Sequence, residues 1–87
     1  MGNNRVTVIE LSRRPIHPET TYVVFEDSNK AKEFLDDISK NPHLFRVEKI
    51  RENIDEPKFG YIHEVFYDVS FEKLRTAYYG TGQFGAR

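Results

Sequence analysis

The hydrophobic pattern of this chain changes its period twice between Arg5 and Tyr79, each time from alternation to helical spacing. Alternation is typical of a β-strand, and helical spacing is typical of an amphipathic helix. Two strands are therefore expected before each of two helices, in the order ββαββα. Because 87 residues are too few for a second core, we predict a single α+β domain. It should have two layers: a four-stranded, mainly antiparallel sheet, with the helices packed on one face.

The first two strands and the first helix are the most clearly marked elements. Residues 5–11 are rich in β-branched side chains, and their apolar positions change parity near Val8, which indicates burial on both faces or a bulge. Residues 20–26 have the strongest β propensity and are expected to form a central strand. A helix should follow the cap residues 27–28 and end before Asn41. Its apolar stripe consists of Ala31, Phe34, Leu35 and Ile38.

Two further strand-like segments, residues 44–53 and 59–69, are predicted to form an antiparallel hairpin. The residues 54–58 that join them are rich in turn-forming types and have a suitable length. In the second arm the odd positions are mostly apolar, so the odd face is expected to be the core face. That face carries Phe59, Tyr61, His63, Val65, Tyr67 and Val69.

The chain ends in a short helix and a glycine-rich tail. Ser70 is a suitable N-cap for a helix over residues 71–79, and Gly80 supplies a left-handed stop. We therefore expect one domain over residues 1–79. Residues 80–87 have a composition that does not fold alone and are expected to form a flexible tail.

Charge and cysteine content exclude several classes of protein. The net charge is −1 and the sequence pI is about 6.3, so no overall field attracts nucleic acid or an anionic membrane. No cysteine is available for a disulfide or a thiolate zinc site, so stability must come from packing. This includes packing in a homodimer, through either an unpaired sheet edge or the hairpin predicted above. No apolar signal or membrane segment is recognisable, so we expect a cytoplasmic protein without membrane contact.

No constellation in the sequence indicates catalysis, a metal or a cofactor. The histidines His17, His43 and His63 do not have the spacing of a metal-binding pair. The glycines at 80, 82 and 85 match the letters of a dinucleotide fingerprint, but the required strand before them and helix after them are missing. We therefore expect a non-catalytic protein that needs neither metal nor cofactor.

The remaining class is a small binding module that acts through protein–protein interaction. Stand-alone modules of this kind are typical regulators or inhibitors of a larger host or viral complex. Large aromatic side chains and arginines dominate interface energetics, so they are the expected partner-binding residues. The aromatic set is Tyr61, Tyr67, Tyr78, Tyr79 and Phe84, and the arginine set is Arg13, Arg14, Arg46, Arg51 and Arg75.

The alternative is a protein that binds single-stranded RNA or DNA on an aromatic sheet face. In the predicted hairpin, Tyr61 and Tyr67 would stack on bases, while Arg46, Lys49 and Arg51 on the neighbouring strand would contact phosphates. Acidic residues are interleaved with these cations and cancel much of their field, which favours the protein partner.

Overall fold

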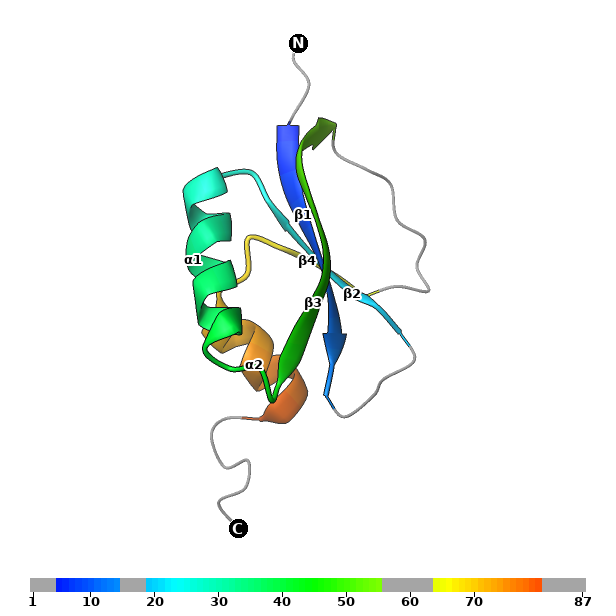
Figure 1. Ribbon diagram of the computed structural model, residues 1–87, viewed down its shortest axis with the longest axis vertical. Coiled ribbons are helices and arrows are strands. Elements are labelled where there is room, and N and C mark those ends of the chain that lie inside the picture. Colours follow the sequence, from blue (N-terminus) through cyan, green and yellow to red (C-terminus); the bar gives the residue numbers. More distant parts are fainter. Residues whose placement is uncertain (1–4, 15–18, 56–63, 81–87) are drawn as a thin grey trace.

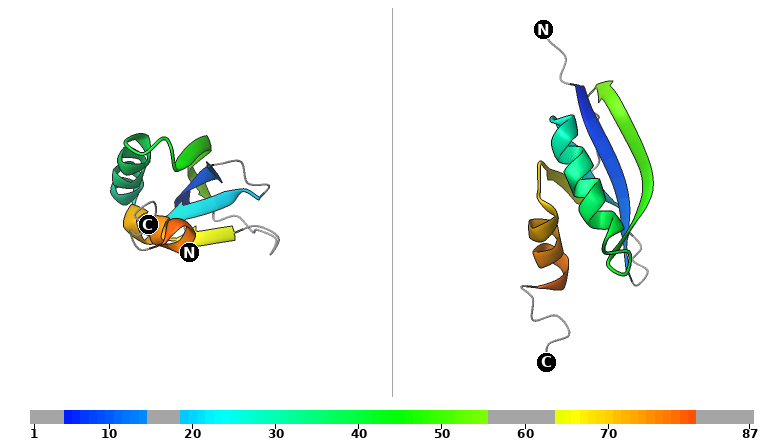
Figure 2. Two further views of the ribbon diagram at one scale, coloured as in Figure 1. Left: turned by 90° about the horizontal axis from the view of Figure 1, so that it is seen from below. Right: turned by 60° about the vertical axis from the view of Figure 1, so that its left-hand side comes forward.

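The computed structural model describes residues 5–14, 19–55 and 64–80, which form an α+β domain. Within these residues the sheet has four strands and two helices accompany it, so the predicted class is confirmed. Both helices lie on the same side of the sheet (Figures 1 and 2). In chain order the elements are β1 (Arg5–Arg13), β2 (Thr21–Phe25), α1 (Ser28–Ser39), β3 (Phe45–Asp55), β4 (Glu64–Tyr67) and α2 (Phe71–Tyr79).

The sheet is mixed, with the strand order β3-β1-β2-β4. Strand β1 is antiparallel to both β2 and β3, whereas β4 runs parallel to β2, so the prediction of a mainly antiparallel sheet is only partly matched. The predicted hairpin of β3 and β4 is wrong, because these strands lie at opposite edges of the sheet. Once β1 has paired on both sides, the free edge of β2 accepts β4. The pairing continues beyond β4, where the Asp68 N–H donates to the Val24 carbonyl at 2.8 Å.

Strand β1 occupies the centre because its side chains are buried on both faces. Val8 and Ile9 are consecutive and are 1% and 0% exposed. The register of β1 with β3 shifts between Val6 and Val8, which confirms the irregularity expected near Val8, and shifts again between Glu10 and Leu11. Such bulges re-aim side chains along the longer strand. As a result, the pattern along β3 cannot be read by simple alternation.

The main core lies between the sheet and the helices. Strand β4 contributes Phe66 to it, with Val65 on the opposite face and Tyr67 exposed, so within β4 the predicted odd face is not the core face. Of the other predicted positions, Val69 packs against the main core, and Phe59, Tyr61 and His63 lie outside the described residues. On the second face of the sheet, the side away from the helices, Val6, Val8 and Val24 form a smaller buried cluster. The main core consists of Ile9, Leu11, Val23, Phe25, Ala31, Phe34, Ile38, Leu44, Phe45 and Leu74.

Both helices begin at the expected caps. The Asp27 side chain accepts from the Asn29 N–H at 2.8 Å, and the Ser70 hydroxyl accepts from the Lys73 N–H at 3.2 Å. Helix α2 ends at Gly80, whose φ of 85° is in the left-handed region, as predicted. These caps satisfy backbone donors at the two helix starts that would otherwise have no partner.

Candidate functional site

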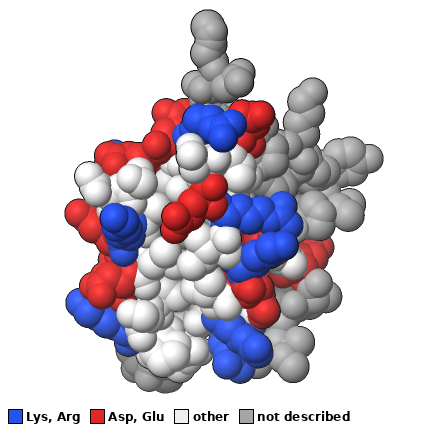
Figure 3. All heavy atoms as spheres, turned by 45° about the horizontal axis from the view of Figure 1, so that its top comes forward, with Lys and Arg blue, Asp and Glu red and all other residues white. Residues whose placement is uncertain are grey.

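An apolar strip between α1 and β3 is the clearest candidate for a contact surface. We call it the α1–β3 strip and define it as Leu35, Val47 and Ile50. Leu35 and Val47 are partly buried against the main core, and Ile50 is 41% exposed. The pairing of Ile50 with Ile9 places Ile50 on the helix side of the sheet. Figure 3 shows an uncharged area between α1 and β3, bordered by acidic and basic side chains in alternation.

Sequence reasoning missed the α1–β3 strip because the strip depends on a bulge. Val47 and Ile50 have opposite parity, so a regular strand would place them on opposite faces. The register shift opposite Glu10 and Leu11 leaves Val47 beside Leu11 and Ile50 beside Ile9, which brings both to the helix side. The break in alternation between Val47 and Ile50 was the available signal.

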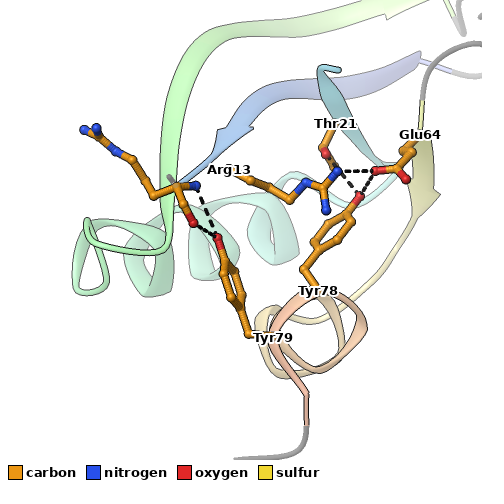
Figure 4. Close-up of polar contacts among 6 residues, drawn as sticks. Arg13, Thr21, Glu64, Tyr78 and Tyr79 are labelled. Carbon is orange, nitrogen blue, oxygen red and sulfur yellow. Dashed lines mark hydrogen bonds and ion pairs between the residues drawn. The ribbon is translucent and has the colours of Figure 1, made fainter. Parts of the chain in front are cut away.

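Four of the predicted partner-binding residues meet at the end of α2. Figure 4 shows that Tyr78 and Tyr79 leave the helix end toward two different strand ends. The Tyr78 hydroxyl donates to the Glu64 carboxylate at 2.5 Å and lies 3.1 Å from the Thr21 hydroxyl. The Arg13 guanidinium stacks 3.7 Å from the centre of the Tyr78 ring and lies 3.2 Å from the same Glu64 oxygen. These contacts attach α2 to β1, β2 and β4.

Tyr79 makes the corresponding attachment on the other side of the helix end. Its hydroxyl accepts from the Arg14 N–H at 3.2 Å and lies 2.6 and 2.7 Å from the carbonyl oxygens of Arg14 and Leu44. Its ring stands edge-on to Phe45, with centres 5.6 Å apart. Tyr78 and Tyr79, which we call the tyrosine pair, are therefore engaged within the fold, and so are Arg13 and the backbone of Arg14.

The tyrosine pair predicts a pH effect on stability. Burial, followed by the hydrogen bond to Glu64, raises the pKa of Tyr78 from 10.0 to about 12. The folded state therefore retains the phenolic proton at a pH where the unfolded chain loses it. This stabilisation is fully present below pH 10 and is lost as the pH rises toward 12. Because the ring is partly exposed and solvent screens it, we expect a loss of about 1 kcal/mol, not the full value of the shift.

A comparison with Tyr78→Phe isolates this effect from the other groups that titrate at high pH. The free energy of unfolding of both proteins would be measured by urea denaturation between pH 9 and pH 12. The advantage of the wild type over the variant should shrink by about 1 kcal/mol across this range. A constant difference would contradict a raised pKa.

The other predicted residues are not brought together. Arg46 and Arg51 lie on β3 and Tyr67 lies on β4, so three strand spacings, about 14 Å, separate them. The prediction that they are on neighbouring strands was wrong. Arg51 pairs with Glu10 at 3.1 Å, and Arg46 lies 3.8 Å from Glu48. Arg75 pairs with Glu72 along α2, while Tyr61 and Phe84 lie outside the described residues.

The outer edge of β3 is a sheet edge through which the homodimer expected from the sequence would pair. Within the described residues, no strand pairs with this edge. However, β3 is rich in exposed charges and its pairing with β1 contains two register shifts. Charges and bulges are devices that protect natural sheet edges from pairing. The homodimer therefore remains a prediction, and β3 does not support it.

The described residues contain neither a candidate metal-binding cluster nor a candidate membrane-spanning helix. No group of three or more His, Cys, Asp or Glu side chains that could hold a metal occurs among residues 5–14, 19–55 and 64–80. In the same part of the chain, neither helix is long and apolar enough to cross a membrane. No protein-family model, curated protein or solved structure matches the chain.

Proposed function

We propose that the protein is a small, non-catalytic binding module that acts by contact with a protein partner, as a regulator or inhibitor of a larger host or viral complex. The observation that carries this proposal is the α1–β3 strip. Ile50 is exposed on the helix side of β3, the side that also carries Val47, and Leu35 of α1 is partly buried against the same core. Charges of both signs border the uncharged area in Figure 3. An apolar centre with a polar rim is the usual composition of a protein–protein interface.

The strip is supported from below by rigid elements. Leu35 and Val47 pack against the main core, and β3 is held along its length by β1. A surface on such elements loses little conformational entropy when it binds, so more of the contact energy appears as affinity. Ile50 would be the anchor, since it is the member of the strip with the largest exposed fraction.

The test is capture of a protein partner by the tagged protein from nuclease-treated lysate, with Ile50→Asp as the variant. A charge at this position would have to be desolvated on binding, so we expect at least tenfold less captured partner. Because Ile50 is 41% exposed, the variant should still fold, and thermal unfolding checks this. Tyr67→Asp, at a 55% exposed position on the second face, is the matched control. Loss of the partner with Tyr67→Asp and not with Ile50→Asp would contradict the proposal.

Binding of single-stranded nucleic acid on the second face is the second candidate. It is favoured by Tyr67, a largely exposed ring whose strand neighbour Val65 packs on that face. The ion pairs of Arg51 with Glu10 and of Arg46 with Glu48 reduce the field available to phosphates. Salt distinguishes the two candidates, because phosphate contacts lose affinity steeply as salt rises and apolar contacts do not.

A further inference from the structure

A groove lies on the flank of α1 that faces α2, opposite the flank that borders the α1–β3 strip. Its volume is about 260 Å³, and it runs between α1 and residues 68–71. Phe25 and Phe34, which are 2% and 3% exposed, form its floor with the partly buried Val69 and Phe71. The volume is below the usual range for a drug-sized ligand or cofactor, so the groove has room for one large apolar side chain.

The rim of the groove is mainly acidic. Among the residues that the structure describes, Glu33, Asp37 and Asp68 lie around it together with one cation, Lys30. Within residues 5–14, 19–55 and 64–80, none of these three carboxylates forms an ion pair. The overall charge of the chain is only −1, so this concentration of negative charge around an apolar floor is local.

Two features fix the carboxylates in place around the groove. Lys30, Glu33 and Asp37 follow helical spacing along one face of α1, so the helix sets their positions. Asp68 has a left-handed φ of 52°, and its carboxylate accepts from the Glu26 N–H at 3.4 Å. Asp tolerates this backbone conformation better than most residues, so Asp68 forms part of the second wall of the groove with little backbone strain.

We propose that this groove receives an apolar side chain of the protein partner that is flanked by lysine or arginine. The apolar side chain would cover Phe34 and Val69, and the flanking cations would lie against Glu33, Asp37 and Asp68. The proposal rests on the proposed function, since it names the chemistry by which the partner is recognised. A partner that contacts both flanks of α1 would meet the α1–β3 strip and the groove together.

The experiment is an NMR titration of the isotope-labelled protein with a short acetylated peptide that has a phenylalanine between arginines. Comparison peptides have glutamates in place of the arginines, or alanine in place of the phenylalanine. We expect amide shifts centred on Lys30 and Val69, and an affinity about tenfold higher than for either comparison peptide. Equal affinity for the arginine and glutamate peptides, or shifts centred elsewhere, would overturn the proposal.

Variants on α1 test whether the preference for the arginine peptide comes from the carboxylates on the rim of the groove or from general electrostatic attraction. The double variant Glu33→Gln with Asp37→Asn keeps the shape of the groove and should remove most of the preference for arginine. Asp36→Asn removes a charge from the same helix outside the groove and should leave the preference unchanged. Equal effects of the two would also overturn the proposal. If Ile50-dependent capture of a partner persists while the peptides show no preference, the groove assignment fails and the proposed function stands.

Discussion

Phe45→Ala is expected to remove much of the stability of the domain. Phe45 is 1% exposed and stands at the first position of β3, with ring contacts to Phe71, Tyr78 and Tyr79. Truncation of a buried phenylalanine costs about 3–5 kcal/mol. A domain of this length has roughly 4–13 kcal/mol in total. The loss also affects Tyr78 and Tyr79. Their rings pack against Phe45, and their hydroxyls make the hydrogen bonds that attach α2 to the strands.

Urea denaturation measures this loss directly, with Ile50→Ala as the control. Ile50 is on the same strand and the same side of the sheet, but it is 41% exposed. We expect Ile50→Ala to cost less than about 1 kcal/mol, because little buried surface is lost. Similar losses for the two variants would mean that Phe45 is not the centre of the packing between β3 and α2.

Leu74→Ala should produce the second large loss, because Leu74 is the one buried residue of α2 and is 0% exposed. We expect about 2–5 kcal/mol, measured as the change in the urea midpoint at constant slope. The helix would lose its buried contact with the core, and the contacts of Phe71 and the tyrosine pair would then hold it. Lower protection of the α2 amides in hydrogen exchange should accompany the loss.

Lys73→Ala is the matched control for the second prediction. Lys73 is the preceding residue of α2, its side chain is exposed, and its N–H bond to the Ser70 hydroxyl comes from the backbone. Its replacement should change the free energy of unfolding by no more than about 0.5 kcal/mol. If Leu74→Ala also lowers the free energy of unfolding by less than about 1 kcal/mol, Leu74 does not pack α2 against the sheet as described.

Local signals explain which elements could be predicted from the sequence. The stripe of α1 and the caps Asp27, Ser70 and Gly80 are set by nearby residues, and the structure has them where they were expected. The irregularity near Val8 was likewise visible as a change of parity. In each of these places the physical cause lies in residues that are close together in the sequence.

The pairing of β4 with β2 could not be predicted from local signals of this kind. Residues 54–58 have the composition of a hairpin turn, yet β4 pairs with β2, far away in the sequence. That pairing places Phe66 in the main core and depends on which edge β1 leaves open. For the same reason the predicted proximity of Tyr67 to Arg46 and Arg51 failed. Candidate surfaces that span several elements, such as the α1–β3 strip and the acidic groove, require the topology first.

Photo-crosslinking from the α1–β3 strip tests directly whether a protein partner binds there. A photoreactive phenylalanine derivative would replace Ile50 in one protein and Tyr67 in another, and both would be irradiated in lysate. Crosslinks would be identified by mass spectrometry after nuclease treatment. We predict a nuclease-resistant crosslink to one protein from position 50, in larger amount than from position 67. Crosslinks to nucleic acid from position 67, with none to protein from position 50, would mean that the second face binds nucleic acid and that the α1–β3 strip binds no protein.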